Sequence, residues 1–223
     1  MQARSRTPSV WSLSVSERLV WIDCEMTGLS LVNDALIEVA ALVTDFDLNV
    51  LGDGVDVVIK PPAESLDQMD PFVRQMHTTS GLLDVLNDGV SLADAEDAVL
   101  SYLSAHCAEG SRPPLAGNSV GTDRNFIARD LPALDAYLHY RIVDVSSVKE
   151  LSKQWFPRAY YNSPAKAGGP RALADIRESI EELRYYRDAV FVAPPGPDAT
   201  TAREIAARHQ GALSQHEPGS EHS

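Results

Sequence analysis

Hydrophobic and polar positions in the first sixty residues follow the pattern of short β-strands. Apolar stretches that contain β-branched residues cover 19–23, 35–44 and 54–59, and the turn signals Asn33-Asp34 and Gly52-Asp53-Gly54 separate them. Runs of this length and composition, bounded by turn residues, are typical of strands. The pattern therefore predicts three strands that form a meander.

From Asp70 the apolar positions follow helical spacing. A short helix is predicted near 70–77 and a longer one over 91–107, because apolar residues recur there three and four positions apart. Further elements are a strand at Leu115-Ala116 after Pro113-Pro114, a helix capped by Thr122 or Asp123 that runs toward Arg129, a strand at 141–145, a helix that opens at Ser146, and a helix over 171–187 after the Pro/Gly-rich loop 157–170. Three strands followed by alternating helices and strands predict an α/β fold, a sheet with helices on its faces.

Length and composition predict one folded domain. With 223 residues and 44% hydrophobic content, the chain can bury a core without disulfides. We expect the domain at 18–192, a flexible N-terminal extension at 1–17, and a flexible polar C-terminal tail at 193–223, with a weak helix at 202–213. The arginines among the first 18 residues are also compatible with a transit peptide, but an extension or a misassigned start is favoured.

The two cysteines and the lengths of the apolar runs indicate a cytoplasmic protein. Cys24 and Cys107 have no CxxC spacing and no disulfide-framework pattern, which suits a reducing compartment. No apolar run approaches the roughly 18 residues that span a bilayer. We therefore expect no membrane partner.

The net charge limits the kind of nucleic acid that the chain could bind. The formal charge is −13, from 19 basic and 32 acidic residues. Proteins that bind long duplexes rely on many Lys and Arg contacts with phosphates. The balance argues against long duplexes and favours a small substrate, although acidic surfaces are also common in proteins that bind no nucleic acid.

Two carboxylates stand at the end of the first predicted strand. Asp23 and Glu25 are two residues apart, and side chains at i and i+2 of a strand point the same way. Carboxylates this close repel each other, and the pKa of one of them rises unless a cation lies between them. Mg²⁺ takes such oxygen ligands, which favours a metal-dependent phosphodiesterase; a strand that simply ends in solvent is the alternative.

Three segments that lie far apart in the sequence each contain acidic residues within a distinctive run of neighbouring residues. They are Trp-Ile-Asp-Cys-Glu-Met-Thr-Gly-Leu at 21–29, Gly-Asn-Ser-Val-Gly-Thr-Asp-Arg at 117–124, and Arg-Ala-Leu-Ala-Asp-Ile-Arg-Glu-Ser at 171–179. In this order they resemble the motifs of the oligoribonuclease family, within the DEDD superfamily of 3′-to-5′ exonucleases. The resemblance runs from about Leu19 to Val192 and implies a ribonuclease H-like exonuclease fold with a five-stranded mixed sheet flanked by helices.

The resemblance also implies a catalytic set of four carboxylates. Asp23, Glu25, Asp123 and Asp175 would hold two divalent cations, Mg²⁺ or Mn²⁺, which can activate a water and stabilise the leaving 3′ oxygen. Hydrolysis would release 5′-mononucleotides from the 3′ end of RNA. Without the resemblance, a helix-capping Asp123 and a surface Asp175 are the simpler interpretation.

One position departs from the family pattern. In the histidine-bearing branch of the superfamily, a His five residues before the last motif Asp is the general base, and here that position is Pro170. Proline suits the first turn of a helix, but it accepts no proton, and a general base is typically worth about 10² to 10⁴ in rate. Three explanations stay open: a crippled or engineered enzyme, a sequence error in a working one, or a native variant that relies on the cations alone.

Substrate contacts follow from the same resemblance. Leu29 and Phe72 match positions where the family wedges and stacks the two bases of a dinucleotide, and core packing is the alternative for both. The remaining implied contacts, in stretches that resemble the family's phosphate-binding pocket, are His77, Ser119, Tyr140 and Arg141.

The resemblance further implies a homodimer, since in that family the residues that match Tyr140 and Arg141 reach the active site from the second subunit. The expected function is therefore a metal-dependent exoribonuclease for dinucleotides and other very short single-stranded RNAs. A proofreading-type DNA 3′-to-5′ exonuclease and a catalytically silent binder of short oligonucleotides are the alternatives. Competition between a dinucleotide and a long single strand separates the first of these from the expected function.

Overall fold

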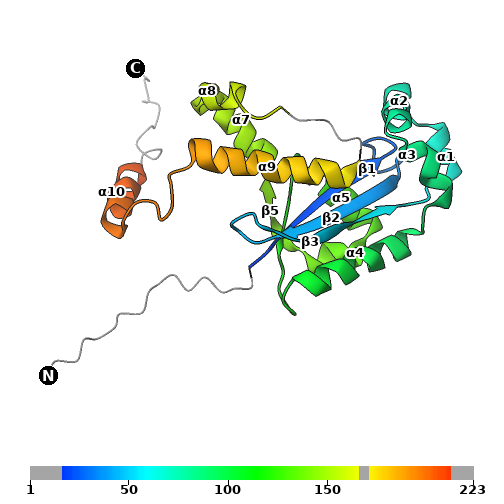
Figure 1. The fold of residues 1–223 in the computed structure, drawn as a ribbon, viewed down its shortest axis with the longest axis horizontal. Coiled ribbons are helices and arrows are strands. Elements are labelled where there is room, and N and C mark those ends of the chain that lie inside the picture. Colours follow the sequence, from blue (N-terminus) through cyan, green and yellow to red (C-terminus); the bar gives the residue numbers. More distant parts are fainter. Residues whose placement is uncertain (1–16, 166–170, 212–223) are drawn as a thin grey trace, which may run out of the picture.

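A single mixed sheet lies at the centre of the molecule (Figure 1), in a computed structural model that describes residues 17–165 and 171–211. Its strand order is β3-β2-β1-β4-β5. The strands are β1 (Leu19–Met26), β2 (Leu36–Thr44), β3 (Val50–Val58), β4 (Pro114–Gly117) and β5 (His139–Asp144). β2 is antiparallel to β1 and β3, whereas β4 is parallel to β1 and β5. The predicted five-stranded mixed sheet is confirmed.

Helices cover both faces of this sheet. They are α1 (Ala63–Asp67), α2 (Pro71–Thr79), α3 (Leu82–Val85), the 3-10 helix η1 (Leu86–Asp88), α4 (Leu92–His106), α5 (Gly121–Asp130), α6 (Pro132–Tyr137), α7 (Val145–Trp155), α8 (Pro157–Tyr161), α9 (Ala172–Val190) and α10 (Ala199–His209). The long helix α9 crosses one face and α4 lies on the other (Figure 1). None of these helices, within 17–165 and 171–211, is long and apolar enough to cross a membrane.

The alternation of side chains along β1 divides the core into two layers. Val20 and Ile22 pack with the buried residues of α4, α5 and α6. Leu19 and Trp21 point to the opposite face, where they pack with the apolar side of α9. Because the side-chain period of a strand is two, the odd-numbered positions that follow, 23 and 25, also face α9.

The turn between β2 and β3 differs from the prediction. Gly52 and Gly54 lie inside β3 with φ values of 75° and 91°, and the pairing register shifts between Ala41 and Val43 on the neighbouring strand. The glycines therefore permit a bulge rather than a turn, since left-handed φ favours glycine. The chain reverses instead between Asp45 and Asn49, where the Asp45 Oδ1 accepts from the Asn49 N–H at 2.9 Å.

One predicted helix cap is wrong, and one predicted helix start is displaced by one residue. α5 begins at Gly121 without a side-chain cap, because the Asp123 carboxylate points to β1 instead. α7 begins at Val145, one residue before the predicted Ser146, and Asp144 caps it by accepting from the Ser146 N–H at 2.9 Å.

Short helices account for most of the elements that the sequence pattern missed. α1, α3, α6 and α8 span four to six residues each, too few for periodicity to be recognised; α8 lies in the predicted loop 157–170. The weak helix predicted at 202–213 corresponds to α10, which Asp198 caps and which buries none of its residues. Pro170 lies outside the described residues, as do 1–16 of the predicted extension and 212–223 of the predicted tail.

Candidate metal centre and active site

Three carboxylates from two elements meet at the end of β1. Asp23 and Glu25 face α9, and Asp175 lies in the first turn of that helix. One oxygen from each carboxylate lies within 4.8 Å of the other two. The ligand atoms are all carboxylate oxygens, the type that Mg²⁺ and Mn²⁺ prefer. The donor set therefore fits a divalent cation.

The fourth predicted acid approaches from the other side of the sheet and is not part of this three-carboxylate group. Asp123 is 6% exposed in the first turn of α5, and its Oδ1 accepts from the backbone N–H of Cys24 at 3.0 Å. Cys24 lies between Asp23 and Glu25. This hydrogen bond therefore fixes Asp123 beside the strand residue that separates the two β1 carboxylates.

Burial and mutual repulsion raise the pKa of these acids. Burial is the largest cause for Asp23, followed by the charges of Asp123, Glu25 and Asp175, and its pKa rises to about 9. Burial, Glu38 and Asp175 raise the pKa of Glu25 to about 7. Burial raises the pKa of Asp123 to about 6, against the lowering effect of the Cys24 N–H. A bound cation would reverse these shifts, because it favours the charged form.

A further buried acid anchors the start of α9. Glu38 lies opposite Glu25 in the β1–β2 register and is fully buried. Its Oε1 accepts from Arg171 Nε at 2.6 Å, and its Oε2 accepts from the Ala172 N–H at 3.2 Å. The first N–H groups of a helix have no intrahelical partner, so Glu38 caps α9 from a neighbouring strand. This contact positions the helical turn that carries Asp175.

Arg171 joins the strands to the helix at the same place. Its Nη2 lies 2.5 Å from Glu38 Oε1 and 3.6 Å from Asp56 Oδ2. Burial and the charge of Glu38 raise the pKa of Asp56 to about 6. Arg171 therefore balances negative charge next to the three-carboxylate group.

The loop of the second motif is attached to α9 and α7. Asn118 Nδ2 donates to Ser179 Oγ at 2.8 Å and to Glu182 Oε2 at 3.1 Å. Ser119 is exposed with a left-handed φ of 53°, its N–H donates to Asp144 Oδ1, and its hydroxyl lies 3.1 Å from the Ser146 hydroxyl. The backbone of this predicted phosphate contact is thus held in one conformation.

His77 lies against the three-carboxylate group rather than on an open surface. It is 1% exposed, its Nε2 contacts the Met26 carbonyl oxygen at 2.9 Å, and its Nδ1 lies 3.9 Å from Glu25 Oε2. The contact with a carbonyl requires a proton on Nε2, since a carbonyl oxygen only accepts. The side of the ring that carries Nδ1 therefore faces Glu25.

Both predicted base-stacking residues are exposed. Leu29 is 75% exposed in the loop after β1, and Phe72 is 76% exposed in the first turn of α2, which Asp70 caps. The alternative that they belong to the core is wrong. Their exposed apolar surface is compatible with contact to bases.

Tyr140 and Arg141 lie away from the acidic group of the same chain, on the edge strand β5. Tyr140 is 74% exposed, Arg141 is exposed, and the Arg141 guanidinium carbon lies 5.5 Å from the centre of the Tyr140 ring. The ring of the partly buried His139 lies 4.4 Å from the Tyr140 ring between centroids. These side chains are available for contact with a second molecule.

Comparison with known proteins identifies the class to which this fold and site belong. Residues 20–183 match the sequence profile of the exonuclease family RNase T. The chain therefore belongs to this exonuclease family.

Named relatives define its place within the family. An oligoribonuclease of Streptomyces avermitilis is 68% identical over 195 residues, which cover 87% of this chain and 98% of the relative. One of Cutibacterium acnes is 60% identical over 87% of this chain and 96% of its own length. The resemblance to oligoribonucleases that the three motifs predicted is confirmed.

Solved structures confirm the fold. A structure of exonuclease I has a TM-score of 0.59 at 16% identity and covers 78% of this chain. The zinc-bound complex of E. coli exonuclease I with single-stranded DNA has the same score, identity and coverage. The chain spans about two fifths of the length of those proteins, at 41%, and at this identity the likeness shows the fold alone.

Sequence reasoning missed Glu38 and the role of Arg171. The signal was present, because Glu38 is a lone charge in the apolar run 35–44, and Glu is almost never fully buried unless it is paired. Its partner Arg171 is 133 residues away in the sequence, so no local pattern connects the two.

The raised pKa values predict a dependence of stability on pH. Asp23 titrates near 4 when unfolded and near 9 when folded. The folded state therefore binds more protons between these values, and the free energy of unfolding falls as pH rises from about 4 to 9. Without added metal, the melting temperature of Asp23→Asn minus that of the natural chain should increase as pH rises from 5 to 9.5. A difference that stays constant over this range would contradict the prediction.

Added Mn²⁺ should stabilise the natural chain more at pH 8.5 than at pH 6, because the ligands must lose protons.

Glu38→Gln should weaken metal binding. The amide can still accept from Ala172, but it loses the ion pair with Arg171, so the turn that carries Asp175 loses its fixed position. Loss of such an outer partner typically costs about 10- to 100-fold in metal affinity. Isothermal titration with Mn²⁺ measures this change.

Glu96→Gln provides the matched control. Glu96 Oε1 accepts from Ala133 and Leu134 at the start of α6, so it caps a different helix in the same way. The Mn²⁺ affinity of this variant should equal that of the natural chain. Equal losses in both variants would mean that Glu38 acts only through general stability.

Proposed function

We propose that this chain is a 3′-to-5′ exoribonuclease that hydrolyses dinucleotides and other very short oligoribonucleotides to 5′-mononucleotides. The observation that carries the proposal is the convergence of Asp23, Glu25 and Asp175 in one acidic group. The chain in which they converge is 68% identical to an oligoribonuclease over nearly the whole length of that relative.

The proposed catalytic residues are the four carboxylates. Asp23, Glu25 and Asp175, with Asp123 beside them, would hold two divalent cations, Mg²⁺ or Mn²⁺. When bound, such cations activate water and stabilise the charge that develops on the leaving oxygen. Asp123 is oriented for this role by the Cys24 N–H at 3.0 Å. His77, with Nδ1 on the side of Glu25, would restrict the position of that carboxylate.

The proposed substrate contacts favour short chains. Leu29 and Phe72 offer exposed apolar surface to the two bases of a dinucleotide, and stacking on aromatic side chains tolerates any base. Ser119, Tyr140 and Arg141 would contact phosphate, with Tyr140 and Arg141 supplied by the second subunit of a homodimer. A partner side chain at that position would close the site to longer chains.

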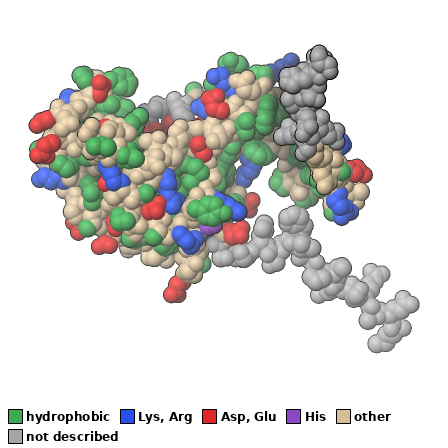
Figure 2. Space-filling model, turned by 180° about the vertical axis from the view of Figure 1, so that it is seen from behind, with side chains coloured by type: hydrophobic (Ala, Val, Ile, Leu, Met, Phe, Trp, Pro, Cys, Tyr) green, Lys and Arg blue, Asp and Glu red, His purple; other side chains and the backbone are tan. Residues whose placement is uncertain are grey.

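The surface of the chain supports a small substrate. The face in Figure 2 shows Lys and Arg side chains scattered among acidic and apolar ones, with no continuous basic band among its described residues. Long nucleic acids would find few phosphate contacts there. The two buried free thiols, Cys24 and Cys107, fit the cytoplasm, where we place the activity.

A catalytically silent binder of short oligonucleotides is the second candidate. Pro170 favours it, because proline provides no base at the position where the histidine-bearing branch has one. In that case the four carboxylates would still bind cations and a dinucleotide, but the bond would remain intact.

Substitution of Pro170 tests the two candidates. The natural chain and Pro170→His are each assayed with a dinucleotide and with a long single strand, in Mg²⁺ and in Mn²⁺. We expect Pro170→His to raise kcat on the dinucleotide by about two orders of magnitude, because a general base is restored, and both chains to prefer the dinucleotide. Binding without turnover by the natural chain would favour the silent binder. A preference of both chains for the long strand would contradict the proposed substrate.

Mixing of two inactive variants tests the shared active site. Asp175→Asn lacks a metal ligand, whereas Arg141→Ala lacks the contact proposed to come from the partner. A mixed dimer of the two contains one site with intact carboxylates and an intact partner arginine. Activity should therefore recover to about a quarter of that of the natural dimer when equal amounts are exchanged at random. Each variant incubated alone is the control, and no recovery despite subunit exchange would show that Arg141 acts within its own chain.

A further inference from the structure

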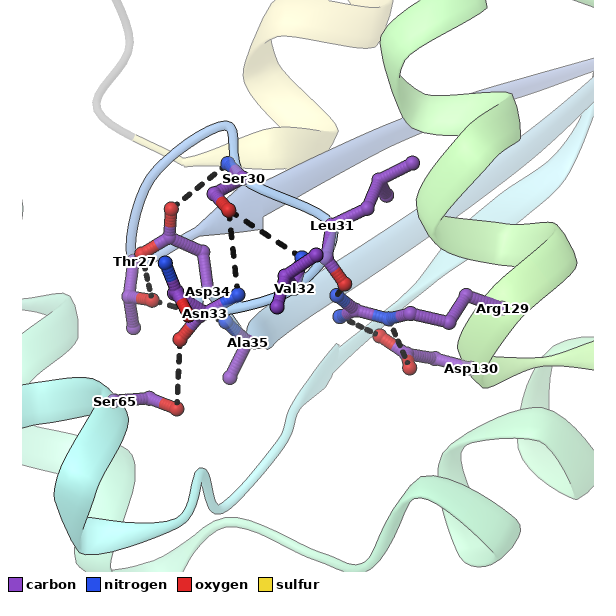
Figure 3. Close-up of polar contacts among 10 residues, drawn as sticks. All are labelled: Thr27, Ser30, Leu31, Val32, Asn33, Asp34, Ala35, Ser65, Arg129 and Asp130. Atoms are coloured by element: carbon purple, nitrogen blue, oxygen red, sulfur yellow. Dashed lines mark hydrogen bonds and ion pairs between the residues drawn. The ribbon is translucent and has the colours of Figure 1, made fainter.

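The loop between β1 and β2 is organised around one carboxylate. Both oxygens of Asp34 are used: Oδ1 accepts from Thr27 Oγ1 at 3.1 Å, and Oδ2 accepts from the Ser30 N–H at 2.8 Å. The Asp34 side chain points back into its own loop (Figure 3). Thr27 is 1% exposed and its hydroxyl oxygen also accepts from the Ala35 N–H at 3.0 Å. The two ends of the loop are thus joined through Asp34.

Asp34 contacts the residues on both sides of Leu29. Ser30 donates its N–H to the carboxylate, and a Cβ atom added at Gly28 would overlap all three atoms of the same carboxylate group. Glycine at position 28 is therefore required for Asp34 to approach. Leu29 lies between these two contacts, so one carboxylate fixes the backbone before and after it.

Two other elements hold the loop from outside. Arg129 of α5 donates from Nη1 to the Leu31 carbonyl oxygen at 2.5 Å, and Asp130 fixes the same guanidinium through two contacts at 2.6 and 2.7 Å (Figure 3). Ser65 of α1 donates to the Asn33 carbonyl oxygen at 3.5 Å. Hydrogen bonds therefore attach the loop to both α5 and α1.

Hydrophobic burial does not explain why this loop is ordered. Leu29 is 75% exposed and Val32 is 90% exposed, so these side chains contribute little to the core. Ordering a loop costs conformational entropy. A loop that is already ordered before binding loses little further entropy when it binds a ligand, so its affinity for the ligand is higher. Leu29 follows Glu25 by four residues and thus lies within about 14 Å of the acidic group.

We propose that Asp34 is a positioning residue for the substrate, which acts by holding Leu29 in place for contact with the bases of a dinucleotide. The proposal rests on the proposed function and adds to it a residue that lies outside the carboxylate group and the proposed substrate contacts. Asp34 itself touches no reacting atom. Its role is to preform the contact that distinguishes a substrate with two bases from a ligand with one.

Binding of two ligands by Asp34→Ala tests the proposal. Dissociation constants are measured for a dinucleotide and for a 5′-mononucleotide with Ca²⁺ present, so that the result does not depend on turnover. We expect the dinucleotide to bind about tenfold more weakly, as partial loss of an apolar contact of this size implies. Mononucleotide binding should change less than twofold, because a single base does not require the wedge. Equal losses for both ligands, or no loss for either, would overturn the proposal.

A double-mutant cycle identifies the route of the effect. If Asp34 acts through Leu29, Asp34→Ala should change dinucleotide binding less than twofold in a Leu29→Ala background. A tenfold loss in that background would show that Asp34 acts elsewhere. Arg129→Gln removes the external hydrogen bond to Leu31 and should weaken dinucleotide binding in the same direction. If Asp34→Ala does not fold, Asp34→Asn, which keeps only one acceptor oxygen, takes its place in the same comparison of two ligands.

The affinity of the natural chain for the two ligands distinguishes a failure of the proposed function from a failure of the role proposed for Asp34. If the natural chain does not bind the dinucleotide more tightly than the mononucleotide, the proposed substrate is wrong and the inference fails with it. If it does, and Asp34→Ala retains the same preference, the proposed function stands and only the role of Asp34 is rejected.

Discussion

Repulsion among carboxylates at the end of β1 is the constraint on which the candidate site depends. Asp23 and Glu25 share the α9 face of a strand whose preceding residues are buried, and Asp175 completes a group within 4.8 Å. Without a cation the pKa of Asp23 rises to about 9, so the chain keeps the group partly protonated. A fold that holds acids together at this cost to stability is explained by a ligand that prefers them charged. Divalent cations are such ligands.

The remaining structure around the group keeps the acids in place. Glu38 is buried opposite Glu25 and would increase the repulsion, as its effect on the pKa of Glu25 shows. Its contacts with Arg171 and with the start of α9 offset this effect and fix the helix that supplies Asp175. On the opposite face, the Cys24 N–H orients Asp123. The acids are thus supplied by β1, β2, α5 and α9, so their arrangement depends on the packing of both helices against the sheet.

Local alternation was sufficient to predict the strands along the chain and the shared direction of Asp23 and Glu25, whereas the convergence of Asp175 with them was implied only by the resemblance to the oligoribonuclease motifs. The sequence pattern was insufficient where tertiary contacts compete with local rules. Asp123 looks like a helix cap, but a strand N–H 99 residues away takes its carboxylate. Gly52 and Gly54 look like a turn, but they lie inside β3, where their left-handed φ permits a bulge opposite β2. Asn33-Asp34 was correctly taken as a turn, yet its composition did not reveal the contacts of Asp34 with Thr27 and Ser30.

Under the proposed function, selection of short substrates would depend on exposed apolar side chains that are held on a rigid backbone. An acidic chain offers few contacts to a long polyanion, so under the proposed function affinity for a dinucleotide would come from bound cations and from apolar contact with its bases. Leu29 and Phe72 would provide that apolar surface, since both are exposed and each lies at or next to a backbone N–H that donates to a carboxylate, Asp34 in one case and the Asp70 cap of α2 in the other. Rigid contacts of this kind lose little entropy on binding. Under the proposed function a small number of them would therefore be enough for a ligand of two nucleotides, whereas a longer chain would add charge without adding contacts.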